Sequence, residues 1–155
     1  LAGLLVVVGW RMARLSYERV TSPIAPADRK MLDAGAWFDV CEWIGEHTPR
    51  TAKFLVPKES HSFKWRTGRP EVVTRKDIPQ DAASMVEWHV RLQDVFRIPK
   101  QEPALWLANP DLGRIAQLAE RYEADYLVID NRESLNLPVI YDNETYSVYD
   151  LRELR

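Results

Sequence analysis

Apolar residues recur at helical spacing in three stretches of the chain. Between residues 37 and 44 they stand at i, i+3, i+4 and i+7, which predicts an amphipathic helix that ends at Pro49. A second helix is predicted over residues 81–96, and a third follows residues 109–111, where a capping asparagine precedes a proline. The residues expected to face the core are Trp37, Val40, Cys41 and Ile44, then Met85, Trp88, Leu92, Val95 and Phe96, then Leu112, Ile115, Ala116, Ala119 and Tyr122.

Short apolar runs between these helices predict strands. Residues 53–56 and 71–74 are two such runs, and residues 126–129 are apolar throughout, as is typical of a central strand covered on both faces. Residues 139–149 hold two more runs around a turn-rich segment, which predicts a closing β-hairpin. The order of elements therefore predicts an α/β fold, with a mixed sheet of about five strands packed by three or more helices.

The amino end has a different character. The run from Leu1 to Trp10 carries no charge, and as a helix it would rise about 15 Å, half of a hydrocarbon core of about 30 Å. We interpret residues 1–20 as the end of a transmembrane helix with its juxtamembrane segment, preceded by further spans. A signal peptide is the alternative, but no charged start or cleavage site is present. A proline-containing linker over residues 21–27 leads into a soluble α/β domain over residues 28–155.

Composition and charge narrow the functional classes. The chain has 155 residues, enough for one ordinary domain, and its net charge of −2 argues against a nucleic-acid partner. The one cysteine, Cys41, cannot form an intramolecular disulfide, and its place on an apolar helix face predicts a buried structural thiol. Glycine-rich phosphate loops, nucleophile elbows and paired-cysteine or paired-histidine metal motifs are missing from the sequence. We therefore expect no cofactor, no metal and no catalytic residue in this chain.

Cations and aromatic residues alternate in the stretch from residue 58 to residue 69, directly after a predicted strand. Such a loop suits a lipid phosphate or a sugar stacked on an indole ring. The alternative is that Phe63 and Trp65 anchor the loop in the core while the cations are solvated or lie on a membrane surface. A ligand site requires Lys64, Arg66 and Arg69 to converge on one concave surface. The candidate ligand-binding residues are His61, Lys64, Trp65, Arg66 and Arg69.

Several short motifs carry a resemblance to a known group of proteins. They include a tryptophan helix that ends in Thr48-Pro49, an aromatic loop that ends in Gly68-Arg69, and the late segments 122–126 and 139–143. In this order they resemble an uncharacterised family, a domain of unknown function, of bacterial multi-span membrane proteins. That family looks distantly like membrane glycosyltransferases that use lipid-linked sugars. The W-W-D-x-G motif of oligosaccharyltransferase tails is absent, which argues against oligosaccharyl transfer itself.

The resemblance implies a cellular location and a role for the domain. It implies the bacterial cytoplasmic membrane, with the domain on the extracytoplasmic side, whereas Arg11, Arg14 and Arg19 beside the apolar run favour the cytoplasmic side. It also implies that the catalytic acids of the longer protein lie in loops between spans. The chain is then a soluble carboxy-terminal accessory domain of a polytopic, glycosyltransferase-like membrane protein. The alternative is a structural or protein-interaction tail without a small-molecule site. An autonomous enzyme would need a pocket that gathers titratable groups, which the sequence does not indicate.

Overall fold

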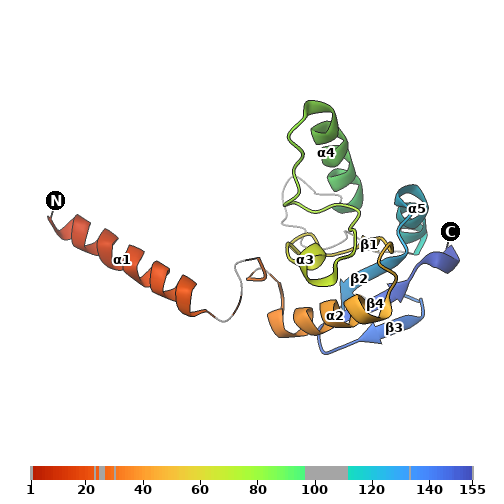
Figure 1. Ribbon diagram of the computed structural model, residues 1–155, viewed down its shortest axis with the longest axis horizontal. Helices are drawn as coiled ribbons and strands as arrows, with labels where there is room; N and C mark the ends of the chain where they lie inside the picture. The colour runs from red at the N-terminus through yellow and green to blue at the C-terminus, as the bar shows by residue number, and fades with distance from the viewer. Residues whose placement is uncertain are drawn as a thin grey trace.

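The computed structural model describes residues 2–22, 24, 27–29, 31–96, 112–132 and 134–154. Within them lie five α-helices and a four-stranded mixed sheet (Figure 1). The elements in chain order are α1 (Ala2–Thr21), α2 (Ala34–His47), β1 (Phe54–Leu55), α3 (Phe63–Thr67), α4 (Ala82–Phe96), α5 (Leu112–Tyr122), β2 (Tyr126–Asp130), β3 (Val139–Asp142), β4 (Tyr146–Asp150) and the 3-10 helix η1 (Arg152–Leu154).

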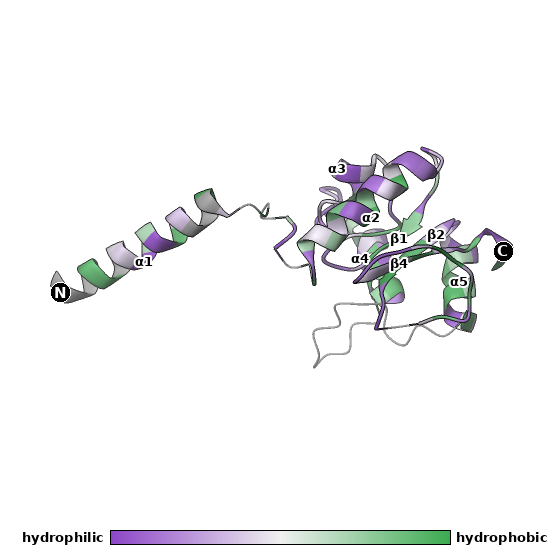
Figure 2. Cartoon of the chain, turned by 90° about the horizontal axis from the view of Figure 1, so that it is seen from below, coloured by the Kyte–Doolittle hydropathy of each residue, from purple (hydrophilic) through white to green (hydrophobic). Residues whose placement is uncertain are grey.

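The sheet has helices on both faces. Its strand order is β1-β2-β4-β3, in which β1 and β2 are parallel and the other pairs are antiparallel. Successive side chains of a strand point to opposite faces, so Tyr126 and Val128 of β2 pack with α2, whereas Leu127 and Ile129 pack with α4 and α5. Figure 2 shows α2 and α5 on opposite sides of the sheet. The prediction that residues 126–129 form a central strand covered on both faces is confirmed.

Helix α2 follows the prediction closely. The side chains of Trp37, Val40, Cys41 and Ile44 are all buried, and Asp33 caps the helix by accepting a hydrogen bond of 3.1 Å from the N–H of Ala36. Burial raises the pKa of the Cys41 thiol far above its ordinary value. Cys41 is thus a buried thiol in the core between α2 and the sheet.

Helix α4 departs from the prediction in its first turns. Asp81 caps it by accepting a hydrogen bond of 2.9 Å from the N–H of Ser84, and Leu92, Val95 and Phe96 are buried as expected. The prediction for Met85 was wrong, because its side chain is 43% exposed. The buried residues of α4 are confined to its carboxy-terminal half, and Figure 1 shows its amino-terminal half extending away from the sheet.

The third predicted helix is present as α5, whereas the second predicted strand is not formed. In α5 the buried residues include Ile115 and Ala119, as expected, while the predicted helix start at residues 109–111 lies outside the described residues. Residues 71–74 do not form the fifth strand, since only an isolated parallel bridge joins Glu71 to Phe54. After that bridge, side chains of α4 donate hydrogen bonds to the backbone carbonyl oxygens of this segment. Arg91 donates to the carbonyl of Val72, and Trp88 donates to that of Thr74. Side-chain bonds therefore take the place of a continued ladder.

The amino-terminal helix α1 lies apart from the α/β body (Figure 1). Its described apolar side chains, which include Val6, Val7 and Trp10, are exposed. Among the described residues, no helix combines the length and the apolar composition needed to cross a bilayer. Residues 23, 25 and 26 of the predicted linker lie outside the described residues.

Candidate functional site

The stretch of residues 58–69, predicted as a loop, contains the short helix α3, and part of this helix is exposed to solvent. Phe63 is fully buried, and its ring packs on Trp37 and Phe54 at centroid distances of 6.1 and 5.2 Å. The helix ends at Gly68, whose φ of 65° lies in the left-handed region that glycine adopts without strain. Because Phe63 faces the core, the next residues face outward. The side chains presented on the surface are Lys64, Trp65 and Arg66.

A cavity of about 520 Å³ lies beside α3, and we call it the α3 pocket. Asp28, which is buried, accepts hydrogen bonds from the Ser62 hydroxyl and from Arg66 Nη2, the second at 2.9 Å. The guanidinium of Arg66 also lies over the ring of Phe38, at 3.7 Å from its centroid. These contacts fix the Arg66 side chain and offset its charge. The residues that line the α3 pocket are Ala27, Asp28, His61, Ser62, Trp65, Arg66 and Lys76.

The rim of the α3 pocket is basic and aromatic. Trp65 is 83% exposed, and the ammonium group of Lys76 lies 4.9 Å from its ring centroid. Lys76 Nζ also donates a hydrogen bond of 3.2 Å to the carbonyl oxygen of His61. His61 Nε2 lies 3.4 Å from Glu59 Oε2, and Arg75 approaches the other oxygen of the same carboxyl group at 3.5 Å. The rim therefore combines an indole face with the ammonium group of Lys76, while Asp28 and Glu59 offset the charges of Arg66 and Arg75.

Arg69 has a structural position in the interior. Only 7% of the residue is exposed, and its guanidinium donates to the carbonyl oxygens of Gly45, Thr48 and Thr67 at 2.7, 2.5 and 2.6 Å. Carbonyl groups in the last turn of a helix have no partner within the helix, so a cation is well suited to this place. Arg69 thus ties the end of α2 to the end of α3.

The structure divides the five candidate residues among different places. His61, Trp65 and Arg66 share the α3 pocket, whereas Lys64 pairs with Asp77 at 3.9 Å along a separate cleft. Lys64, Arg66 and Arg69 therefore do not converge on one concave surface, and a site built on these three cations is not formed. The alternative prediction, that Phe63 and Trp65 both anchor the loop in the core, is right for the buried Phe63 but wrong for the exposed Trp65.

The sequence analysis missed two charged residues of the α3 pocket, Asp28 and Lys76. Asp28 precedes α2 and Lys76 follows residues 70–74, and no motif links either of them to α3. Their charges could be read from the sequence, but their convergence depends on tertiary contacts such as the Arg66 to Asp28 ion pair. Among the described residues, no group of three or more histidine, cysteine or acidic side chains could hold a metal ion.

Comparison with known proteins adds a family match. Residues 35–95 match the model of a family described as a domain of unknown function, DUF6798. A search of curated proteins finds no match. The matched segment includes α2, β1 and α3 and reaches nearly to the end of α4. This chain is therefore similar, over the segment that supplies most of the α3 pocket, to a family whose function is not known.

Proposed function

We propose that the α/β body is a membrane-proximal accessory domain, which α1 attaches to a bilayer and whose α3 pocket contacts anionic head groups. The observation that carries this proposal is the basic and aromatic rim of the pocket, one wall of which is formed by Ala27 and Asp28. These two residues are where the chain arriving from α1 enters the body.

The exposed apolar surface of α1 supports attachment to a bilayer. Its exposed apolar side chains are spread around the helix, and its charged residues begin only at Arg11. The first half of α1 is therefore apolar on all sides, which is typical of a helix in lipid or in a protein core. Trp10 would lie at the level of the head groups, where tryptophan is enriched, and Arg14 lies against its ring at 5.8 Å. The exposed apolar residues of α1 are Val6, Val7, Trp10, Met12, Leu15, Tyr17 and Val20.

The covalent connection restricts how far the body can move from α1. From Thr21 to Asp28 the chain spans seven residues, which extend to at most about 25 Å. Asp28 lines the α3 pocket, so the pocket stays within that reach of the end of α1. At a surface of anionic lipids a lysine such as Lys76 contributes about 1 kcal/mol.

The resemblance to membrane glycosyltransferases supports a finer version of this proposal. In it, the longer protein acts on lipid-linked sugars, and this domain assists by holding lipid phosphates close to the bilayer. The five candidate residues form no catalytic cluster, because Arg66 is paired with Asp28 and Arg69 is buried against carbonyl groups. The domain is thus an accessory in this proposal.

Sedimentation of the full chain with vesicles tests the proposal. Vesicles of phosphatidylcholine alone and of phosphatidylcholine with phosphatidylglycerol are compared, and stronger binding to the anionic vesicles is expected. Val6→Asp with Val7→Asp should abolish binding to both. Lys76→Ala should weaken binding to anionic vesicles about fivefold, since 1 kcal/mol corresponds to about that factor. The matched control is Arg50→Ala, which removes an exposed cation outside the α3 pocket.

Two results would contradict the proposal. Failure of the unmodified chain to bind either kind of vesicle would remove the membrane role as a whole. If Lys76→Ala and Arg50→Ala weaken binding equally, the α3 pocket makes no specific contribution. The second result would favour the alternative, in which the body is a protein-interaction tail without a small-molecule site.

A further inference from the structure

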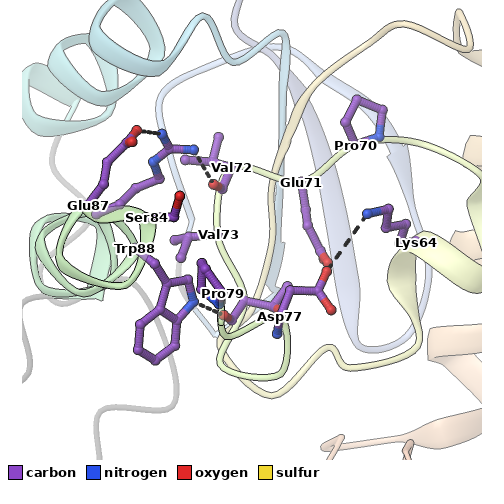
Figure 3. Close-up of a pocket in the computed structure, with 12 residues that line it drawn as sticks. Lys64, Pro70, Glu71, Val72, Val73, Asp77, Pro79, Ser84, Glu87 and Trp88 are labelled. Carbon is purple, nitrogen blue, oxygen red and sulfur yellow. Dashed lines mark hydrogen bonds and ion pairs between the residues drawn. The ribbon is translucent and has the colours of Figure 1, made fainter. Parts of the chain in front are cut away.

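A second concave site lies along α4, on residues that the proposed membrane role does not use. It is a cleft of about 260 Å³, formed between α4, residues 70–74 and the loop before α4, and we call it the α4 cleft. Figure 3 shows Glu71, Asp77 and Lys64 converging at one end, with Trp88 and Glu87 on the side of α4. The cleft thus gathers several titratable side chains in one place, which the sequence did not indicate.

The wall of the cleft is held in place by α4. Trp88 Nε1 donates a hydrogen bond of 2.8 Å to the carbonyl oxygen of Thr74, and Arg91 donates one of 3.3 Å to that of Val72. The bridge between Glu71 and Phe54 connects the same segment to the sheet. The backbone that carries Glu71 is therefore fixed from two sides, and the cleft is preformed.

Two buried polar atoms of cleft residues have no hydrogen-bond partner among the described residues. They are Glu71 Oε2 and Arg91 Nε. A buried polar group without a partner destabilises the fold, so native proteins normally satisfy it with protein, water or ligand. One of these atoms belongs to a carboxyl group and the other is an obligatory donor. A hydroxyl group, which both donates and accepts, can satisfy either of them.

The balance of charges in the α4 cleft favours a neutral ligand. Burial, followed by the nearby charge of Asp77, raises the pKa of Glu71 to about 8, so this carboxyl group is mostly protonated at neutral pH. The other charges balance, because Lys64 faces Asp77 at 3.9 Å and Arg91 is paired with Glu87. With Glu71 protonated, the charged side chains of the cleft sum to zero. An ionic ligand would gain little net attraction there.

The remaining lining is apolar and rigid. Pro70, Val72, Val73 and Pro79 supply aliphatic surface, and Trp88 supplies an aromatic ring. Ligand sites commonly combine such walls with a few convergent polar groups, and their volumes are usually about 300–1,000 Å³. A cleft of about 260 Å³ thus suits a compact ligand of roughly one ring.

We propose that the α4 cleft binds a neutral polyhydroxylated ring, such as a single sugar residue, with Glu71 and Arg91 bonded to its hydroxyl groups. The C–H faces of the ring lie against the proline, valine and tryptophan side chains. This site is distinct from the α3 pocket, and the proposal does not rest on binding of the body to a membrane.

The test uses ligand-observed saturation-transfer NMR on the full chain, which detects weak binding. The neutral probes are glucose, galactose, mannose and myo-inositol, each offered separately. Glucosamine and glucose 6-phosphate are the charged counterparts, because they keep the ring of glucose and add a positive or a negative charge. At about pH 7 we expect saturation transfer to at least one neutral probe and weaker transfer to its charged counterparts.

Variants of Glu71 connect the signal to the cleft. Affinity of the unmodified chain should fall about tenfold from pH 7 to pH 9, because the protonated fraction of a group with a pKa of about 8 falls by that factor. Glu71→Gln keeps the size and a donor, so it should bind without this pH dependence. Glu71→Ala should lose binding, whereas Glu46→Gln, an exposed change on α2, should behave as the unmodified chain does.

Specific results would overturn the proposal. Absence of transfer to all four neutral probes would do so, as would transfer confined to glucosamine or to glucose 6-phosphate. Unchanged binding by Glu71→Ala would also do so. Glu71→Gln is nearly isosteric and removes only the titration, so a folded variant with unaltered pH dependence would show that Glu71 does not contact the ligand. Failure of vesicle binding would leave this proposal intact, since the two sites are measured separately.

Discussion

Replacement of Glu71 by glutamine should change how the stability of the fold depends on pH. The pKa of Glu71 is raised from 4.5 to about 8, chiefly by burial and then by Asp77, while Lys64 and Lys76 act in the opposite direction. Between these two pKa values the folded chain keeps a proton that the unfolded chain has released. The free energy of unfolding contributed by Glu71 therefore falls as the pH rises through this window. Glutamine cannot titrate, so the variant should lack this loss.

The magnitude follows from the two pKa values. Each pH unit inside the window corresponds to about 1.4 kcal/mol, and a window from 4.5 to about 8 gives an upper limit of about 5 kcal/mol. Glu71 is only half-buried, and partial exposure screens its carboxylate, so we expect a loss below that limit. Below about pH 4.5 the two proteins should differ little, and above about pH 8 the variant should be more stable by a constant amount.

Urea unfolding at a series of pH values measures this difference. Titrations of other groups are shared by the two proteins and cancel when the unfolding free energies are subtracted. Glu46→Gln on α2 is the control, and its difference from the unmodified chain should not vary with pH. A difference between Glu71→Gln and the unmodified chain that is constant from about pH 5 to about pH 9 would refute the reasoning, because Glu71 would then titrate as an exposed carboxyl group does.

Three further outcomes are expected. Arg69→Ala should lower the free energy of unfolding by about 3 kcal/mol, because the hydrogen bonds from the buried guanidinium to three carbonyl oxygens are lost. Urea unfolding measures this loss, and an unchanged free energy of unfolding would contradict a stabilising role for Arg69. Burial acts to raise the pKa of Asp94, but hydrogen bonds from Arg114, Tyr122 and Arg121 outweigh it and hold the pKa near 2. The stability that ionised Asp94 contributes should be present above about pH 4 and lost as the pH falls toward 2. Asp94→Asn should therefore lack this loss when the free energy of unfolding is measured across that pH range. Cys41 should react with a thiol reagent only as fast as the chain opens, because it is buried with a raised pKa, and immediate reaction of the folded protein would contradict the burial.

The core of α2 and the central strand could be predicted because their periodicity is local. Trp37, Val40, Cys41 and Ile44 fall on one face of any α-helix, and a strand that is apolar at every position must be covered on both sides. The prediction for Met85 failed because helical spacing gives a face but not its extent. Which turns of α4 reach the sheet depends on where the helix is placed.

The candidate site shows the same division between local and tertiary information. The sequence identified a stretch rich in cations and aromatic residues, and three of its five candidates do share a pocket. Lys64, Arg66 and Arg69 are separated because successive residues of a short helix point in different directions, and because Gly68 turns the chain so that Arg69 points into the interior. Residue spacing does not contain that information.

The sequence by itself determined the α/β class, the buried face of α2, the central strand and the distinct apolar amino end, since each depends on the order and spacing of residues within one segment. Only the tertiary structure decided the two concave sites. Asp28 and Lys76 complete the α3 pocket from outside α3, and Glu71 becomes a protonated acid only where the packed chain buries it close to Asp77. Burial and charge proximity are properties of the packed chain, and they decide which of many surface ions can form a site.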